Sequence, residues 1–167
     1  MLVHSCGILR EGQVLLFTGP CEVGKTTVGR LCSEDFGTML NDEMMLVSWP
    51  QTWERSVLAR SAPIFGELPF GSSVIAPLSS VFILKKSQRT ALRRLERIEA
   101  YLRFLRQVMS PADFNNPDTR TKISCMDLFA SEVTRTTPFF ELEFTRDRYL
   151  LWDVEAGHKE LMVRGMI

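Results

Sequence analysis

The sequence lacks a long apolar run, an excess of charge of one sign and paired cysteines, and each absence excludes a class of protein. No apolar run approaches the roughly 20 residues of a membrane-spanning helix, so we expect no membrane partner. The 20 basic and 20 acidic residues cancel, which leaves no net charge to attract nucleic acid. The four cysteines have no C-x-x-C spacing, which argues against structural zinc. Since there is also no signal-peptide pattern, we expect reduced thiols in a cytoplasmic protein.

The chain does contain enough apolar material for one core. Its 167 residues are 45% hydrophobic, which suits a single domain over residues 1–167 better than two domains. We therefore predict one α/β domain.

Hydrophobic patterning predicts the order of the elements. In the first half we expect strands at residues 2–9 and 13–18, a helix from Lys25 to about Gly37, a strand at 38–40 and an extended run at 44–49. Residues 50–79 are rich in Pro, Gly and Ser, which predicts loops before a buried strand at 80–85. In the second half we expect a long amphipathic helix over 88–109, a helix at 119–135, strands at 139–145 and 149–153, and a short helix from Val154.

Residues 19–26 read G-P-C-E-V-G-K-T and fit the pattern G-x-x-x-x-G-K-[ST]. They stand between a strand-like run and a helix-like run, where a phosphate-binding loop has to stand. Glycines let the backbone curl around an anion, the helix N-terminus adds positive potential, and the lysine reaches the outer phosphates. The sequence therefore predicts a nucleotide-phosphate site for ATP, formed by Gly19, Pro20, Cys21, Glu22, Val23, Gly24, Lys25, Thr26 and Thr27, with the Thr26 hydroxyl directed at Mg²⁺.

Two acidic residues, Asp42 and Glu43, follow the predicted strand at 38–40. A carboxylate at a strand end beside a phosphate loop can accept the proton of an attacking hydroxyl or help to hold the metal. Asp42 is therefore the candidate base and a candidate metal ligand, although the same residue type also caps turns. Glu43 is either a group that orients the metal site or a solvated side chain.

Four stretches together resemble the catalytic domain of HPr kinase/phosphorylase, and more closely its short HPr-kinase-like relatives. They are His4 within Val3-His4-Ser5-Cys6-Gly7, the 19–26 motif, Leu40-Asn41-Asp42-Glu43, and the stretch from Gly66-Glu67-Leu68-Pro69 to Ala76-Pro77-Leu78. The resemblance covers residues 2 to about 150. It implies a P-loop nucleotide-binding fold with a central mixed β-sheet flanked by helices, like the C-terminal domain of HPr kinase.

The resemblance also implies roles for individual residues. In that family the loop lysine binds phosphate, the next hydroxyl residue holds Mg²⁺, an upstream histidine lies in the active site, and an aspartate of an acidic pair is the catalytic base. The matching positions here are Lys25, Thr26, His4 and Asp42, and Glu67 is the best match to a glutamate that helps to hold the metal. A lone histidine on an apolar strand is also typical of a core, and Glu67 can equally be an exposed loop carboxylate.

The sequence departs from the family pattern in the loop itself. Cys21-Glu22 stands where the family usually has Ser-Gly, and a carboxylate about 5 Å from a phosphate costs roughly 1 to 3 kcal/mol unless it turns away. Thr27 stands where the classical enzymes have an acidic residue, which argues against the reverse, phosphorolytic reaction.

The leading functional hypothesis is an ATP- and Mg²⁺-dependent kinase that transfers the γ-phosphoryl group to a hydroxyl. The acceptor would be a serine of a peptide or protein, or a small molecule, and a homo-oligomer is consistent with the family. Two alternatives remain, a catalytically weak nucleotide-binding regulatory module and a simple NTPase. Elsewhere, Trp49 and Trp53 could stack on adenine, but packing in the core or a loop is the favoured interpretation. The arginines at positions 89, 93 and 97 recur every four residues, and the favoured interpretation is a solvated helix face on which Arg89, Arg93 and Arg97 pair with Glu96 and Glu99.

Overall fold

A computed structural model describes residues 1–49, 56–64, 66–67, 74–109 and 119–145, together with residues 156 and 159. Within these residues the elements follow one another as β1 (Leu2–Arg10), β2 (Gln13–Thr18), α1 (Lys25–Asp35), β3 (Thr38–Asn41), β4 (Met44–Val47), β5 (Leu58–Ser61), β6 (Ala76–Lys86), β7 (Ala91–Arg94), α2 (Arg97–Leu105), β8 (Val108–Met109), α3 (Thr119–Thr136) and β9 (Phe139–Phe144).

The strands form one mixed sheet in the order β2-β1-β4-β5-β6-β9-β7. Strand β6 pairs in parallel with both β2 and β9, whereas β1 pairs in antiparallel fashion with β2, β3, β4 and β8. The additional β2–β6 pairing closes β1, β4, β5, β6 and β2 into a ring. The two longest strands, β1 and β6, therefore hold most of the sheet together.

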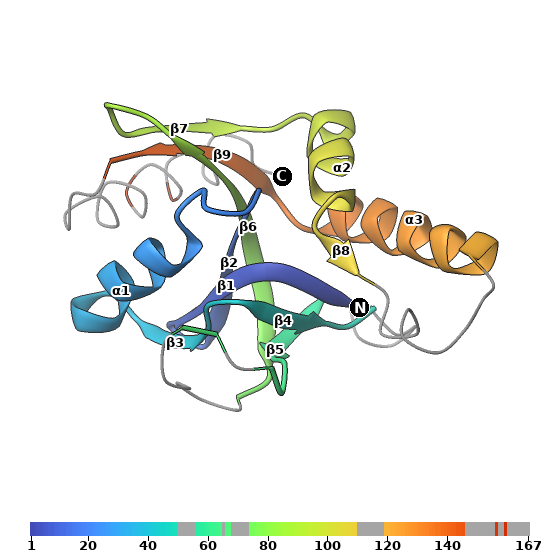
Figure 1. Cartoon of the computed structure of the whole chain (residues 1–167), viewed down its shortest axis with the longest axis horizontal. Helices are drawn as coiled ribbons and strands as arrows, with labels where there is room; N and C mark the ends of the chain where they lie inside the picture. The colour runs from blue at the N-terminus through green and yellow to red at the C-terminus, as the bar shows by residue number, and fades with distance from the viewer. Residues whose placement is uncertain are drawn as a thin grey trace.

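Helices lie on both sides of this sheet, as Figure 1 shows: α1 lies on one side, and α2 and α3 lie together on the other. The fold is thus of the α/β class with a mixed sheet flanked by helices, as the sequence predicts. No helix in the described part of the chain is both long and apolar enough to cross a membrane.

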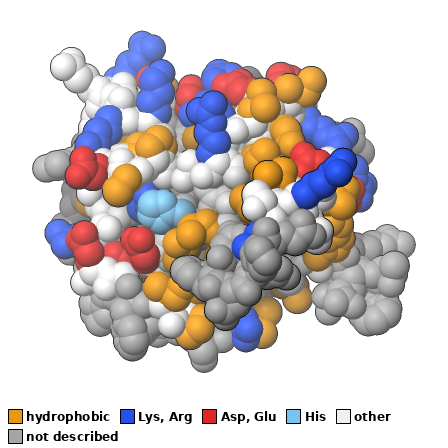
Figure 2. Space-filling model, turned by 45° about the vertical axis from the view of Figure 1, so that its right-hand side comes forward, with side chains coloured by type: hydrophobic (Ala, Val, Ile, Leu, Met, Phe, Trp, Pro, Cys, Tyr) orange, Lys and Arg blue, Asp and Glu red, His pale blue; other side chains and the backbone are white. Residues whose placement is uncertain are grey.

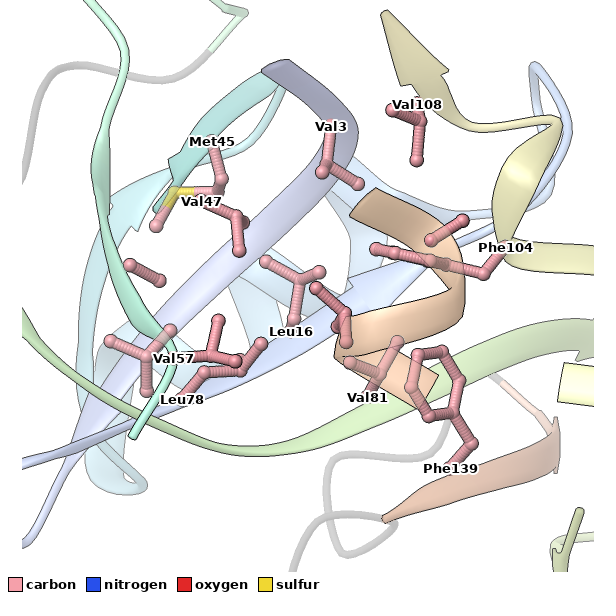
Figure 3. Close-up of a cluster of buried hydrophobic side chains, with 14 of the residues drawn as sticks. Val3, Leu16, Met45, Val47, Val57, Leu78, Val81, Phe104, Val108 and Phe139 are labelled. Atoms are coloured by element: carbon pink, nitrogen blue, oxygen red, sulfur yellow. The ribbon is translucent and has the colours of Figure 1, made fainter. Parts of the chain in front are cut away.

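Two clusters of buried apolar side chains form the core. The larger one joins side chains from β1, β2, β4 and β6 to α2, α3 and β9, and Figure 3 shows Val3, Leu16, Val81, Phe104 and Phe139 within it. The smaller one lies under α1 and contains the stacked rings of Phe17, Phe82 and Phe140, with centroids 4.9 and 5.5 Å apart. Each fully buried phenylalanine contributes roughly 1.5 to 3 kcal/mol of hydrophobic stabilisation.

The prediction of one long helix over residues 88–109 is wrong. Residues 91–94 form strand β7, which pairs with β9 so that Leu92 stands opposite Leu142. Helix α2 covers only Arg97–Leu105, and it buries Ala100 and Phe104 while Ile98 and Leu102 are 75% and 55% exposed. The apolar spacing arises because a strand and a helix with different buried faces follow each other closely, and pairing with β9 overrides local helix propensity.

Other boundaries differ less. The predicted loop region 50–79 contains β5 and the first residues of β6, which begins at Ala76. The strands at 2–9, 13–18, 38–40 and 139–145, the helix after Lys25 and the helix at 119–135 are confirmed to within a few residues. The predicted strand at 149–153 lies outside the described residues, and of the tail from Val154 only residues 156 and 159 are described.

Candidate functional site

The sequence motif at residues 19–26 forms a tight loop between β2 and α1, here called the β2–α1 loop. Gly19, Glu22 and Gly24 have positive φ angles of 153°, 61° and 121°, and Val23 N–H donates to the carbonyl of Pro20 at 3.3 Å. Gly24 is required twice over, because its φ disfavours side chains and an added Cβ would lie 2.6 Å from the Phe144 ring. Alternation of positive and negative φ of this kind turns successive N–H groups toward one side.

The side chain of Lys25 folds back over this loop. Its ammonium nitrogen donates to the carbonyl oxygens of Gly19 at 3.2 Å and Pro20 at 3.1 Å, and the residue is only 6% exposed. Burial lowers the pKa of Lys25, and the negative charge of the nearby Glu43 carboxylate opposes that shift. The lysine is thus held at the mouth of the loop, in the first turn of α1.

The acidic turn after β3 is organised by Asn41. The Oδ1 of Asn41 accepts the N–H groups of Glu43 at 2.7 Å and Met44 at 2.9 Å, which fixes the turn that carries Asp42. Its Nδ2 donates to Ser61 Oγ at 3.2 Å and to the carbonyls of Ala62 and Ile64 at 3.3 and 2.9 Å. One buried amide therefore ties the acidic turn to the segment that follows β5.

That segment continues across the acidic turn. A Cβ built on Gly66 would lie 1.8 Å from Asp42 Oδ1, so only glycine allows the chain to pass there, and Asp42 is 1% exposed. The neighbouring Glu67 is exposed, with its Oε2 3.8 Å from Nη2 of Arg30 on α1. Thr26 and Arg30 are four residues apart on α1 and share a face, so Glu67 contacts the same side of the helix that carries the Thr26 hydroxyl.

His4 lies beside the start of the loop. The register that pairs Ser5 with Thr18 places His4 next to Gly19, and the Thr18 hydroxyl donates to the His4 carbonyl at 2.7 Å. The Nε2 of His4 is 3.6 Å from Glu43 Oε1, and the two side chains are 22% and 44% exposed. Burial and the charge of Lys25 lower the pKa of His4, and Glu43 opposes the shift, so a neutral imidazole is favoured at pH 7.

Cys6 connects the two halves of the site electrostatically. It is fully buried on β1, and burial together with the charge of Asp42 raises the pKa of its thiol, whereas Lys25 lowers it. The thiol is therefore neutral and inert. Asp42 and Lys25 are therefore both close enough to this buried thiol to change its pKa.

A cleft of about 470 Å³ borders the β2–α1 loop. It is lined by Gly19, Pro20, Cys21, Glu22 and Val23, by Ile83, Leu84, Lys85 and Lys86 of β6, and by Arg103, Arg106 and Gln107 at the end of α2. A second cleft of about 310 Å³ adjoins Gly24 and Thr27 and is lined by Glu22, Val23, Lys86, Ser87, Phe144 and Thr145. Both volumes lie within the range of small-molecule sites.

The structure gathers His4, Lys25, Asp42 and Glu43 around one end of the loop, and brings Glu67 to its edge through Gly66. In the part of the chain that the structure describes, no three His, Cys, Asp or Glu side chains converge as a ready-made metal site. Trp49 packs on Phe129 of α3, with ring centroids 6.3 Å apart, whereas Trp53 lies outside the described residues. Arg93 lies on β7 and pairs with Glu99 and Glu141. The predicted placement of Arg89, Arg93 and Arg97 on one helix face is therefore wrong, whereas the predicted pairing with Glu99 is confirmed for Arg93.

Sequence reasoning gave no role to Asn41, Lys86 and Arg106, and quoted Gly66 only as part of the family resemblance. Asn directly before an acidic pair is a signal for a side chain that caps its own turn, and Gly before Glu67 is a signal for a close backbone approach. The two basic residues carry no local signal, because their place in the cleft depends on how β6 and α2 pack.

The sequence matches no protein-family model, and no curated protein shows significant similarity to it. The resemblance to the HPr kinase family therefore rests on the motif residues alone.

Proposed function

We propose that the protein binds Mg-ATP at the β2–α1 loop and transfers the γ-phosphoryl group to a hydroxyl, in the manner of the HPr-kinase-like proteins. The observation that carries the proposal is the loop itself. Its glycines adopt conformations that other residues disfavour, its lysine lies over it, and a histidine and an acidic turn adjoin its first residue. Curled backbone at a helix N-terminus is suited to phosphate groups.

In this proposal each residue acts on a stated atom. The hydroxyl oxygen attacks the γ-phosphorus, the bond to the β,γ-bridging oxygen breaks, and ADP leaves with that electron pair. Lys25 moves from the carbonyls of Gly19 and Pro20 to the phosphate oxygens. Asp42 accepts the hydroxyl proton, and the neutral His4 next to Glu43 orients the acceptor.

The residues present fit a magnesium ion. Mg²⁺ favours hard oxygen ligands and is typically held by one or two protein groups plus the substrate phosphates, so a preformed cluster is not needed. Thr26 and Asp42 would hold it, with Glu67 at the edge of the site. When bound, the ion would neutralise charge on the β- and γ-phosphates.

The first test is thermal unfolding with Mg-ADP and Mg-ATP. A ligand at 100 times its dissociation constant stabilises the native state by about 2.7 kcal/mol. We expect this shift in the wild type and in Lys122→Ala, a control on α3, but not in Lys25→Ala. Equal shifts in Lys25→Ala and the control would show that the nucleotide does not bind at the loop.

The second test separates a kinase from an NTPase and from a regulatory module. With labelled ATP, Asp42→Asn should lower transfer by about 10² to 10⁴. Unchanged Mg-nucleotide binding would assign Asp42 to the base role alone, whereas weaker binding of Mg-nucleotide with metal-free nucleotide unaffected would assign it to the metal as well. Glu43→Gln is the matched neighbour, since Glu43 is the more exposed carboxylate of the turn. Label released only to water would indicate an NTPase. Tight nucleotide binding with neither transfer nor hydrolysis would favour the regulatory module. The observation that supports this alternative is the acidic side chain of Glu22 within the loop.

A further inference from the structure

Four basic side chains and one acidic side chain, that of Glu22, line the larger cleft beside the β2–α1 loop. One wall is residues 19–23, and the other is built from the end of β6 and the end of α2. Two of its four basic side chains are already neutralised. Lys85 Nζ lies 2.7 Å from Glu143 Oε1, and Arg103 Nη1 lies 2.6 Å from Glu141 Oε2.

The other two, Lys86 and Arg106, are exposed, and neither pairs with an acidic side chain within the described ranges. They come from different elements and line the same cleft. Figure 2 shows basic side chains gathered toward the top of the face that it draws, with acidic side chains among them. The lining also contains the Glu22 carboxylate, so the two unneutralised cations leave the cleft with one positive charge in excess, which favours a ligand that brings negative charge.

The cleft shares its loop wall, residues 19–23, with the proposed nucleotide site, and its other wall relates it to the acceptor. Lys25, which serves the nucleotide phosphates, is absent from its lining. The Gln107 end of the cleft adjoins the proposed catalytic residues around His4. The Gln107 carbonyl accepts the His4 N–H at 2.9 Å, and the His4 side chain lies beside Glu43. A molecule that contacts Lys86 and Arg106 in the cleft would therefore also lie beside the strand that carries His4.

We propose that this cleft binds the phosphate acceptor through an anionic group, a carboxylate or a phosphate, held by Lys86 and Arg106 while the nucleotide occupies the loop. The proposal rests on the proposed function and narrows its substrate class to hydroxyl compounds or peptide segments that carry a negative charge. Charge-assisted hydrogen bonds from an arginine and a lysine are the strong contacts for such groups.

The test is a titration followed by ¹⁵N NMR with succinate and with inorganic phosphate as separate probes, and with succinamide as the neutral control. We expect saturable shifts of amides 84–86 and 103–107 with one or both anions, whether or not a non-hydrolysable Mg-ATP analogue is bound. The double variant Lys86→Gln, Arg106→Gln should bind about tenfold more weakly or worse. The charge-matched double variant Arg60→Gln, Arg97→Gln should bind like the wild type, because those residues line no part of this cleft.

The outcomes separate the two proposals. Saturation by succinate alone would assign the site to carboxylates, and saturation by phosphate alone would assign it to phosphates. The acceptor cleft is overturned if neither anion saturates, if the nucleotide analogue displaces both, if only Lys25→Ala weakens them, or if the cleft variant binds as the control does. Failure of the analogue to bind the wild type, with anion binding intact, would instead refute the proposed nucleotide site.

Discussion

Replacement of Asn41 by alanine tests whether a single amide holds the acidic turn in place. The substitution removes the acceptor of two backbone N–H groups, those of Glu43 and Met44, and the donor to two carbonyls, those of Ala62 and Ile64. Asn41 is 3% exposed, so no neighbouring side chain can take over from the surface. The change should therefore loosen both the turn and the segment that covers it.

The magnitude follows from the partners that are left behind. A buried group that loses its hydrogen-bond partner costs about 1 to 3 kcal/mol, and donors cost more than carbonyls because a carbonyl keeps a second lone pair. Three of the four bonds are only partly buried, so water can satisfy some of these groups after truncation. We therefore expect Asn41→Ala to lower the free energy of unfolding by about 2 to 4 kcal/mol.

Urea denaturation measures this loss as a lower midpoint with an unchanged slope. Ser61→Ala is the matched control, because it removes one acceptor of the same Nδ2, which still donates to two carbonyls. It should cost less than about 1 kcal/mol. If Asn41→Ala costs no more than Ser61→Ala, the reasoning that this amide organises the turn is refuted.

Three further predictions follow from the site. The lowered pKa of His4 means that the unfolded chain, with a histidine pKa near 6.5, binds this proton more readily than the native state, so stability should fall as pH drops through 6.5. His4→Gln should flatten that part of the urea-midpoint profile, and equal slopes would contradict the assignment. Glu22→Gly should tighten Mg-nucleotide binding in calorimetry, because it removes a negative charge and also the side chain that disfavours the left-handed φ of 61° at this position. Glu22→Gln removes only the charge and should therefore recover only the charge effect. Gly66→Ala should destabilise by about 1 to 3 kcal/mol, because its Cβ would lie 1.8 Å from Asp42 Oδ1, and an unchanged midpoint would mean that the segment moves freely.

Features that depend on neighbouring residues could be predicted from the sequence. The β1–β2 hairpin has a Glu11–Gly12 turn in which both residues adopt positive φ, and the glycine is a local signal for such a turn. Helix α1 follows a glycine-rich loop, and α3 buries Phe129, Ala130, Val133 and Thr134 on one face. In these segments local preference and tertiary packing favour the same structure.

Features that depend on distant partners could not be predicted. Strand β7 exists because β9 lies beside it, and four-residue β5 is too short to stand out among prolines and glycines. The burial of Asp42 under Gly66 and the bonds of Asn41 to residues 61–64 join segments about 20 residues apart. Sequence periodicity reports which side chains are apolar, but it does not report which strand a segment will join.

The backbone of β1, rather than its side chains, positions the candidate site. The His4 carbonyl accepts the Thr18 hydroxyl at the start of the loop, the His4 N–H donates to Gln107 at the end of the cleft, and the Ser5 N–H donates to the Glu43 carbonyl of the acidic turn. All three bonds survive a substitution of the His4 side chain, because they use main-chain groups of β1. A change of catalytic rate in His4→Gln that leaves nucleotide affinity intact would therefore report the chemistry of the imidazole and not a displaced loop, cleft or turn.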